Sequence, residues 1–410
     1  MKNESRHESS ARDFSLSSLN SQIIELVILG STGSIGVQAL EIVESNPDKF
    51  RVVGLASGSK NIQLLAQQAK KFSVPIIATT GDRIALSAAL KDLGAFANGG
   101  SAEIIDGPTS ASQVAAISCD VVLNGITGSI GLGPTLSALA VGNKVALANK
   151  ESLVAGGDLV MAYGREKIIP VDSEHSALYQ CFLSGRSSEV KQVVLTASGG
   201  PFRDRTDFSD ITVADALSHP TWSMGPVVTI NSATLMNKGL EIIETHYLFD
   251  LPYSKISAVI HPQSVVHSMV EFVDGSTIAQ ASPPNMKGPI AYAISGGARI
   301  AKATLPIDWS ESHTWDFAPI DLTKFPAVDL ARRCGELGGG LPAIFNAANE
   351  VAVEAFLNQE IAFSQIVGIV EGSVEKMGGN SPISIRDLSD VSAIENDAKV
   401  IAGQLVQERK

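Results

Sequence analysis

Cysteine is scarce in this chain. The three cysteines, Cys119, Cys181 and Cys334, are spread over 410 residues, and no two of them form a CxxC pair. A disulfide framework or a thiolate zinc site needs more cysteines at closer spacing, so both are excluded. The low number is typical of a reducing compartment, and we expect a cytoplasmic protein.

Basic residues are also few relative to acidic ones. Lysine and arginine together number 31 against 43 aspartates and glutamates, which gives a formal net charge of −12. Binding to nucleic acid or to an anionic membrane surface depends on a basic face, so neither partner is expected. Any phosphate group that the protein binds must therefore be met by a local pocket.

A membrane-spanning run is missing too. The longest uncharged stretch, residues 121–143, is long enough to cross a bilayer but contains five glycines, a proline and two asparagines. A lipid-exposed helix needs about 20 predominantly apolar residues, so this stretch is interpreted as strand, turn and helix in a soluble core. Residues 1–22 lack the apolar core of a secretory signal and carry acids that transit peptides avoid, so we expect a disordered tail.

Length and hydrophobic pattern predict an α/β protein of two or three domains. Residues 23–171 alternate short β-branched runs with Ala- and Leu-rich amphipathic stretches, which indicates βαβ units in a Rossmann-type domain with a parallel sheet. Residues 172–297 carry longer alternating strands, typical of a largely antiparallel sheet in an α+β domain. Residues 298–325 lack periodicity and are expected to be a linker, and residues 326–410 a small C-terminal helical domain.

A glycine-rich turn lies in the first predicted βαβ unit. The run VILGSTGSIGVQALEIV places glycines at 30, 33 and 36 between a buried strand and a helix. Glycine lets the backbone approach a pyrophosphate, and the N–H groups at a helix start favour its negative charge. The spacing is GxxGxxG and not the common GxGxxG, so a plain strand–helix turn is the alternative. The motif recurs as GITGSIG at 125–131, a tight turn that we expect to line the nicotinamide end.

The end of the second strand indicates which dinucleotide is bound. Enzymes that use NAD usually carry an acid there for the ribose 2′-hydroxyl. Here the strand RVVGLAS runs into Gly58, Ser59, Lys60 and Asn61 with no acid. Small hydroxyls and a lysine suit a 2′-phosphate, so the sequence favours NADP over NAD.

Acidic residues in two segments suggest a metal site. Asp172 and Glu174 follow the strand IIPV, and a period of two would place both carboxylates on one face. In TINSATLMNKGLEIIETHYLFD, Ser232 is a plausible N-cap, and Asn237, Lys238 and Glu241 share one face of the helix that follows. Three carboxylates without a cysteine suit Mg²⁺ or Mn²⁺ over Zn²⁺. A solvated acidic pair and a solvated polar stripe are the alternatives.

Histidines near these motifs are further candidates. His175, beside the acids, and His219 could each be an active-site residue or a structural one, because a lone histidine is more often structural. His261 and His267, in the strand HPQSVVHSM, are interpreted as structural.

Several motifs in order give the chain a family resemblance. GSTGSIG, ANKESLV, PVDSEH, SGGPF, HPTWSMG, SATLMNKGLE, HPQSVVHSMVEF and FNAANEVAVEAF follow one another. From about residue 25 onward the chain resembles the 1-deoxy-D-xylulose 5-phosphate reductoisomerase family of the non-mevalonate isoprenoid pathway. The resemblance implies conversion of 1-deoxy-D-xylulose 5-phosphate to 2-C-methyl-D-erythritol 4-phosphate with NADPH and a divalent metal. It also implies a homodimer, with residues 172–297 serving catalysis and dimerisation.

The resemblance also assigns roles to individual residues. It implies a metal held by Asp172, Glu174 and Glu241. It implies that Glu174 and Glu241 also contact the substrate, together with Lys150, Ser173, Ser198, His219, Ser232, Asn237 and Lys238. Lys150, His219 and the three acids would be the catalytic residues. It implies a lid that includes Trp222 and Met224. It implies NADPH contacts from Thr32, Gly33, Ser34, Ile35, Asn149, Glu151 and Gly225. The 2′-phosphate would be met from the set Gly58, Ser59, Lys60 and Asn61, where this sequence is one residue longer than the expected pattern.

Two other functions are compatible with parts of the sequence. A metal-independent dehydrogenase would need a cysteine nucleophile, and Cys119 is the cysteine nearest a motif, directly before the buried run VVLNG. A non-catalytic NADP-binding sensor would need no carboxylate set. For the reductoisomerase, a cation that chelates a ketone and an adjacent hydroxyl would serve both the rearrangement, by a preferred retro-aldol and aldol route, and the reduction.

Overall fold

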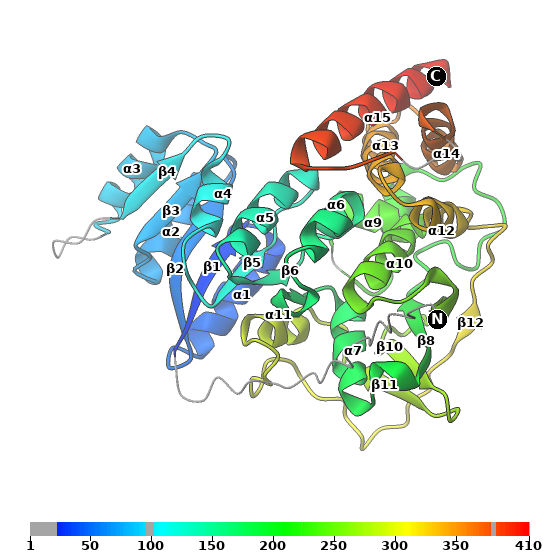
Figure 1. Cartoon of the computed structure of the whole chain (residues 1–410), viewed down its shortest axis with the longest axis horizontal. Helices are drawn as coiled ribbons and strands as arrows, with labels where there is room; N and C mark the ends of the chain where they lie inside the picture. The colour runs from blue at the N-terminus through cyan, green and yellow to red at the C-terminus, as the bar shows by residue number, and fades with distance from the viewer. Residues whose placement is uncertain (1–22, 96–101, 223, 379–382, 410) are drawn as a thin grey trace, which may run out of the picture.

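The computed structural model describes residues 23–95, 102–222, 224–378 and 383–409. A parallel sheet with its helices lies on the left of Figure 1, a second sheet on the right, and the C-terminal helices across the top right. The N-terminal tail predicted for residues 1–22 lies outside the described residues. Over the described chain the fold is α/β, as the sequence predicts.

The first sheet is parallel throughout the described residues, as the β-branched runs predict. Its strand order is β4-β3-β2-β1-β5-β6-β7, and every pair in it is parallel. The strands are β1 (Ile24–Leu29), β2 (Phe50–Ser57), β3 (Ile76–Thr79), β4 (Glu103–Asp106), β5 (Val121–Asn124), β6 (Lys144–Leu147) and β7 (Ile168–Pro170). The order reverses between β1 and β5, and ligands of open α/β sheets bind at the carboxyl ends of the strands at such a point.

Helices connect these strands and cover the sheet. They are α1 (Ser34–Ser45), α2 (Ile62–Lys71), α3 (Arg83–Asp92), α4 (Ser110–Ala115), α5 (Leu132–Ala140) and α6 (Glu151–Met161). A later helix, α11 (Lys287–Ile294), also packs here, because Ile290 and Ile294 belong to the same apolar cluster as Leu26 and Ile28 of β1. A segment predicted within 172–297 therefore covers part of the first sheet.

The two glycine turns lie against each other at the switch point. Gly30 has φ +75°, and a Cβ built on it would lie 2.7 Å from the carbonyl oxygen of Gly125. A Cβ on Gly36, in the first turn of α1, would lie 2.5 Å from the carbonyl oxygen of Gly30. Since real Cβ atoms do not approach backbone this closely, the repeated motif reflects two turns that only glycine allows to pack together.

The second sheet is mixed. Its order over the described residues is β11-β10-β8-β9-β12, with strands β8 (Val190–Ala197), β9 (Ile256–Ile260), β10 (Val266–Phe272), β11 (Thr277–Ala281) and β12 (Ala318–Pro319). The pair β8–β9 is parallel and the other pairs are antiparallel. The expected linker, residues 298–325, contributes β12, which pairs with β9 at the sheet edge.

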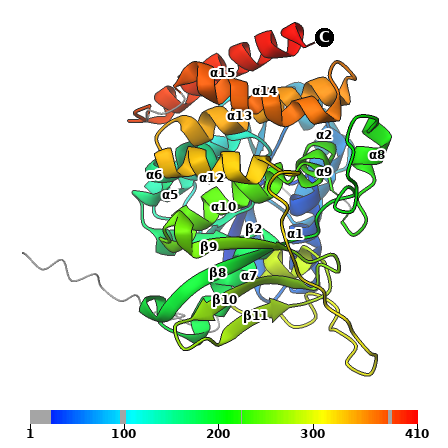
Figure 2. The ribbon, with the colours of Figure 1, turned by 90° about the vertical axis from the view of Figure 1, so that its right-hand side faces the viewer.

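The remaining helices connect this sheet to the C-terminal region. They are α7 (Ser173–Cys181), α8 (Val213–Leu217), α9 (Pro226–Ala233), α10 (Met236–Phe249), α12 (Ala327–Leu337), α13 (Leu341–Leu357), α14 (Ile366–Met377) and α15 (Leu388–Glu408). Figure 2 shows α12 to α15 stacked above α10 and the second sheet. A Cβ on Gly239 of α10 would lie 2.6 Å from the Cβ of Ala331 in α12, so these two helices are in close backbone contact. Along the described chain, no helix has the length and apolar character of a membrane span.

Candidate active site

The first acidic pair lies at the start of α7. Strand β7 ends at Pro170, and Asp172 is the N-cap of the helix, with its carboxylate accepting the Glu174 N–H at 3.3 Å. A strand period of two was predicted to place both carboxylates on one face. That reason was wrong, because the two residues lie at the start of a helix. The carboxylates still converge, since aspartate is a preferred N-cap and glutamate is favoured in the first helical turn.

The second group lies on the first turns of α10. Asn237, Lys238 and Glu241 are on this helix, as the sequence predicts, and Lys238 and Glu241 are buried. The predicted N-cap was wrong, because Ser232 belongs to the preceding helix α9. Between the two helices Leu235 adopts a left-handed conformation with φ +57°, and the Thr234 hydroxyl accepts the Met236 N–H at 3.2 Å.

The two segments meet at their carboxylates. Oxygen atoms of Asp172, Glu174 and Glu241 all lie within 4.8 Å of one another. Only 1% of Glu241 is exposed, so its carboxylate faces the other two and not solvent. A solvated acidic pair and a solvated polar stripe are both excluded by this arrangement.

Two lysines lie among the acids. The Lys150 ammonium contacts Asp172 Oδ2 at 3.0 Å, Glu241 Oε1 at 3.4 Å and Asn237 Oδ1 at 2.7 Å. The Lys238 ammonium contacts Glu174 Oε1 at 3.1 Å and also bonds Glu241, which accepts a further hydrogen bond from the Asn237 amide. These ammonium groups bridge carboxylates in the way a bound cation would.

The protonation of the acids reflects a surplus of negative charge. Burial and the nearby Glu174 carboxylate raise the pKa of Glu241 to about 7. Burial also acts to raise the pKa of Asp172, but the Lys150 ammonium outweighs it and holds this pKa well below its usual range. A carboxyl that is half protonated near neutral pH beside other carboxylates fits the binding of a divalent cation, which would replace the proton.

Ser198, His219 and Ser232 form a separate polar group. The His219 Nε2 atom lies 3.0 Å from Ser198 Oγ and 3.1 Å from Ser232 Oγ. His219 Nδ1 accepts the backbone N–H groups of Thr221, at 3.1 Å, and Trp222, at 2.9 Å. With Nδ1 accepting, the neutral ring carries its hydrogen on Nε2, and burial followed by the Arg203 charge lowers the pKa of His219 and favours that form.

The predicted lid residues follow this histidine along the chain. Trp222 and Met224 lie between α8 and α9, and both are partly buried. The Trp222 ring is 6.2 Å from the His267 ring, and His267 itself bonds Ser282. Gly225 is exposed and directly precedes α9.

Most of the residues predicted for NADPH lie at the carboxyl ends of β1 and β2. Thr32 to Ile35 form the turn into α1, and the Thr32 hydroxyl lies 2.5 Å from that of Ser57, the last residue of β2. Gly58, Lys60 and Asn61 are exposed in the adjoining turn, where Asn61 precedes α2. Because β1 and β2 pair directly, the two turns are neighbours.

Asn149 and Glu151 connect the second glycine turn to the metal-binding candidates. The Asn149 amide donates to the carbonyls of Ile126 and Gly128, each at 2.8 Å, and to Glu151 at 2.7 Å. The other Glu151 oxygen accepts the Gly128 N–H at 3.1 Å. Lys150, between them in the sequence, points to the acids, so three consecutive residues join the glycine turn to the carboxylate cluster.

Models of known families match most of the chain. They are described as 1-deoxy-D-xylulose 5-phosphate reductoisomerase, over residues 26–157, its C-terminal domain, over residues 168–249, and the DXP reductoisomerase C-terminal domain, over residues 281–401. The chain belongs to this family. The resemblance seen in the sequence motifs is thereby confirmed.

Individual reductoisomerases are similar along nearly their whole length. The one from Streptomyces coelicolor is 50% identical over 389 residues, covering 94% of this chain and 93% of its own. The one from Kitasatospora griseola is 51% identical over 383 residues, which cover 93% of this chain and 99% of its own. A solved reductoisomerase from Zymomonas mobilis in complex with NADPH is 38% identical with a TM-score of 0.85, covering 94% and 99%. Another solved reductoisomerase, in complex with NADPH, fosmidomycin and magnesium, is 36% identical with a TM-score of 0.86. The match covers 94% of this chain and 98% of that one.

The rival dehydrogenase is disfavoured by the state of its cysteine. Burial raises the pKa of Cys119 to about 11, so the thiol stays protonated at neutral pH. A nucleophilic cysteine needs a lowered pKa, and the Cys119 amide instead bonds Asn143 in the core. Membership of the reductoisomerase family excludes this rival and the non-catalytic sensor as descriptions of the chain.

Sequence reasoning missed one buried acid in the site. Glu244 lies one helical turn after Glu241 on α10, and only 3% of it is exposed. Its carboxylate oxygen Oε2 lies 3.7 Å from His175 Nδ1, which in turn lies 3.5 Å from Asp172 Oδ1. The i, i+3 spacing of Glu241 and Glu244 was the available signal, since it places both acids on one side of the helix.

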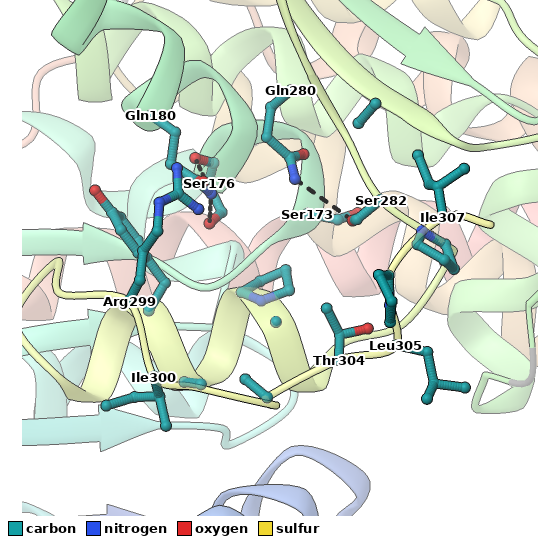
Figure 3. A pocket seen from close by; sticks show the side chains of 18 of the residues that line it. Ser173, Ser176, Gln180, Gln280, Ser282, Arg299, Ile300, Thr304, Leu305 and Ile307 are labelled. Carbon is teal, nitrogen blue, oxygen red and sulfur yellow. Dashed lines mark hydrogen bonds between the residues drawn. The ribbon is translucent and has the colours of Figure 1, made fainter. Parts of the chain in front are cut away.

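A cavity of about 390 Å³ lies next to α7. Figure 3 shows Ser176 and Gln180 of α7 facing it, together with Gln280 of β11 and Arg299 and Thr304 from the segment after α11. Of the predicted site residues, Ser173 alone lines it. It is therefore adjacent to the carboxylate cluster without being part of it.

Proposed function

We propose that Asp172, Glu174 and Glu241 bind the divalent metal with which this reductoisomerase works. The chain converts 1-deoxy-D-xylulose 5-phosphate to 2-C-methyl-D-erythritol 4-phosphate in the non-mevalonate route to isoprenoids, and it uses NADPH and a divalent metal. The observation that carries the site assignment is the convergence of these three carboxylates within 4.8 Å. Their oxygen-only donor set suits Mg²⁺ or Mn²⁺.

When bound, the metal supplies a Lewis acid that polarises the substrate carbonyl and stabilises negative charge on an adjacent oxygen. The chain's own residues determine where that chemistry happens. Lys150 and Lys238 lie on either side of the carboxylates, so their ammonium groups are placed to donate hydrogen bonds to substrate oxygens and to balance charge. Ser173, whose hydroxyl donates to Glu174 at 2.5 Å, would orient that carboxylate.

The group Ser198, His219 and Ser232 is suited to the substrate phosphate. Two hydroxyls and an imidazole N–H can each donate a hydrogen bond to phosphate oxygens, and both hydroxyls lie within hydrogen-bond distance of His219 Nε2. Asn237 and Lys238 were also predicted to bind substrate here, and their present partners lie in the carboxylate cluster. We assign the substrate phosphate to Ser198, His219 and Ser232. We assign the neighbouring substrate hydroxyls to Asn237 and Lys238.

NADPH would lie across the switch point of the parallel sheet. Thr32, Gly33, Ser34 and Ile35 would meet the pyrophosphate, and the exposed turn with Gly58, Lys60 and Asn61 would meet the 2′-phosphate. The turn held by Asn149 and Glu151 would support the nicotinamide end, next to Lys150 and the metal. Trp222 and Met224 would close over the bound substrate and exclude water from hydride transfer.

Three further assignments remain predictions. The domain limits 23–171, 172–297, 298–325 and 326–410 follow from the sequence pattern, although α11 packs on the first sheet and β12 joins the second. The homodimer and the cytoplasmic location follow from the family resemblance and the composition.

The assignment of the metal is tested by Glu241→Gln. This change preserves the shape of the side chain and removes one negative ligand, which costs several kcal/mol of charge stabilisation. We therefore expect kcat/KM for 1-deoxy-D-xylulose 5-phosphate to fall at least about 100-fold. The assay is NADPH oxidation with and without a chelator, alongside NADPH binding, which should be unchanged. Asp250→Asn, at the exposed end of the same helix, is the matched control and should behave like the wild type. Normal metal-dependent turnover in Glu241→Gln would contradict the assignment.

A further inference from the structure

A glutamine is buried on the face of α2 that packs in the parallel-sheet domain. Only 7% of Gln68 is exposed. Leu65 and Ala69, on the same face of the helix, belong to the apolar cluster that contains residues of β1. An amide group in such surroundings costs free energy unless it is hydrogen-bonded. Its hydrogen-bond partner therefore indicates what the glutamine does.

The Gln68 amide bonds the first glycine turn. Its Nε2 atom donates to the backbone carbonyl of Ser31, a fully buried residue, at 2.9 Å. A carbonyl oxygen only accepts, so the amide nitrogen and not the amide oxygen must face it. Within the described residues Gln68 Oε1 has no hydrogen bond, so the bond to Ser31 is the long-range contact that this buried amide makes. A helix outside the turn therefore fixes the direction of the Ser31 carbonyl.

The direction of that carbonyl also fixes a neighbouring N–H group. The peptide bond between Ser31 and Thr32 is trans and planar, so the Thr32 N–H points away from Gln68. The N–H groups of Gly30 and Ser31 both donate to the Ala56 carbonyl, at 2.8 and 3.0 Å. Among the described residues the Thr32 N–H has no such acceptor. It belongs to the turn that we assign to the pyrophosphate, where a phosphate oxygen would accept its hydrogen bond.

We propose that Gln68 is a positioning residue for NADPH, which holds the peptide between Ser31 and Thr32 so that the Thr32 N–H faces the pyrophosphate. Gln68 itself touches neither the cofactor nor the substrate in this role. Without it the buried carbonyl would turn toward another donor, and the N–H group of the same rigid peptide would turn with it. The inference rests on the proposed pyrophosphate site and adds a residue that the family resemblance does not assign.

The position of Gln68 on α2 separates it from the other phosphate site. The helix begins after the turn with Gly58, Lys60 and Asn61, which we assign to the 2′-phosphate. Gln68 follows Asn61 by seven residues, which is about 10 Å along the helix axis. Its hydrogen bond thus acts on the pyrophosphate turn and not on the 2′-phosphate turn. A ligand with a 2′-phosphate and no pyrophosphate distinguishes the two.

Gln68→Met tests the role because it keeps a side chain of similar volume and removes the donor. We expect the NADPH dissociation constant, measured by NADPH fluorescence, to rise about 10- to 100-fold, as for loss of one hydrogen bond to a charged group. The dissociation constant of adenosine 2′-monophosphate, measured by calorimetry, should be unchanged. A glutamine that only stabilised the fold would alter both constants together or neither.

Gln67→Met and Gln68→Asn complete the experiment. Gln67 precedes Gln68 on α2 but is exposed, so its change to methionine should leave both constants unaltered. Gln68→Asn keeps an amide on a side chain that is one methylene group shorter, so its donor no longer reaches the Ser31 carbonyl. It should weaken NADPH binding in the same selective way, and it serves as the test if the methionine variant does not fold.

The outcomes separate this inference from the proposed function. Wild-type NADPH affinity in a folded Gln68 variant would overturn the positioning role, and so would equal weakening of NADPH and adenosine 2′-monophosphate. If Gly36→Ala, which alters the same turn, weakens NADPH binding while Gln68→Met does not, the pyrophosphate site stands and only the positioning role fails. Wild-type NADPH affinity in both variants would instead contradict the proposed pyrophosphate site.

Discussion

The charge state of Glu241 depends on what the site contains. It is buried between two lysines and two other carboxylates, and burial with the Glu174 charge raises its pKa to about 7. Without a cation a proton therefore competes for this carboxylate at neutral pH. A bound divalent ion would release that proton, so metal binding and protonation are linked.

This linkage predicts a pH dependence of metal affinity. Below pH 7 Glu241 is increasingly protonated before the metal binds, so the Mn²⁺ dissociation constant should rise by up to about tenfold per pH unit. Above pH 7 the carboxylate is already ionised and the constant should level off. EPR titrations between about pH 5.5 and 8.5 would measure this, with NADPH affinity as the control. A constant affinity between pH 6 and 8 would contradict the prediction.

Asp172 combines a structural and a chemical role that two substitutions separate. Asparagine caps helices as well as aspartate does, so Asp172→Asn should leave the melting temperature nearly unchanged while weakening Mn²⁺ binding. Asp172→Ala removes the cap as well and should lower the free energy of unfolding by about 0.5–2 kcal/mol. Chemical denaturation and Mn²⁺ titration of both variants provide the comparison. Equal stability of the two would show that the cap of α7 is unimportant.

At the residue scale, the sequence predicted the identity of the acids better than their geometry. Asp172, Glu174 and Glu241 were found from residue type and motif, and the structure brings them together. Their placement on a helical turn could not be read from PVDSEH, because two residues at i and i+2 share a face in a strand and also approach each other at an N-cap. Glu244 was missed although its i, i+3 spacing from Glu241 was visible, because that spacing alone does not separate a buried acid from a solvated one.

At the scale of elements, the tight packing of α1 on β1 fixes where a pyrophosphate can bind. A Cβ on Gly36 would lie 2.5 Å from both the Gly30 carbonyl oxygen and the Ser31 Cα, which are backbone atoms that cannot turn away. The start of α1 is therefore held against the turn after β1, with its N–H groups at the carboxyl edge of the sheet.

Gly36→Ala tests this packing. The added methyl group must push α1 away from the turn, at a cost of about 1–3 kcal/mol typical of overpacking. We expect a lower melting temperature and weaker NADPH binding, measured by the fluorescence of NADPH on titration, with Mn²⁺ affinity unchanged. Gly403→Ala, in α15 where an added Cβ meets open space, is the control and should be neutral or slightly stabilising. Wild-type NADPH affinity in Gly36→Ala would contradict the prediction.

The elements themselves were predictable where their signals are local. Apart from β4, the strands of the parallel sheet follow from periodicity and length, as does α10, and the absence of an acid after β2 is visible directly. Strand order is set by contacts between distant segments, so the parallel β8–β9 pair and the joining of β12 to β9 had no local signal. The packing of α11 on the first sheet also had no local signal, because its apolar pattern would suit either sheet.

At the scale of the whole molecule, the carboxylate cluster depends on the C-terminal helices. α10 carries Glu241 on one side and is covered by α12 on the other, where Gly239 meets Ala331. Asn349 of α13 donates to Asn231 of α9 at 2.9 Å, and Phe345 of α13 is fully buried in the same apolar cluster as α10. The C-terminal helices therefore form part of the core that holds the site.

A chain that stops after residue 325 should for this reason fail to fold. It would expose the apolar face of α10, and each large side chain that loses its burial forfeits about 1.5–3 kcal/mol, so a few of them exceed the 5–15 kcal/mol by which domains are stable. We expect the shortened chain to aggregate or to lack a cooperative melting transition, and to bind neither Mn²⁺ nor NADPH. Adding residues 326–410 in trans should restore little, because α12 packs against α10 and α13 packs against α6 and α9, and the shortened chain would not hold these helices in place. A monodisperse shortened chain with a sharp transition and wild-type NADPH affinity would show that the parallel sheet folds independently of the helices that complete the metal site.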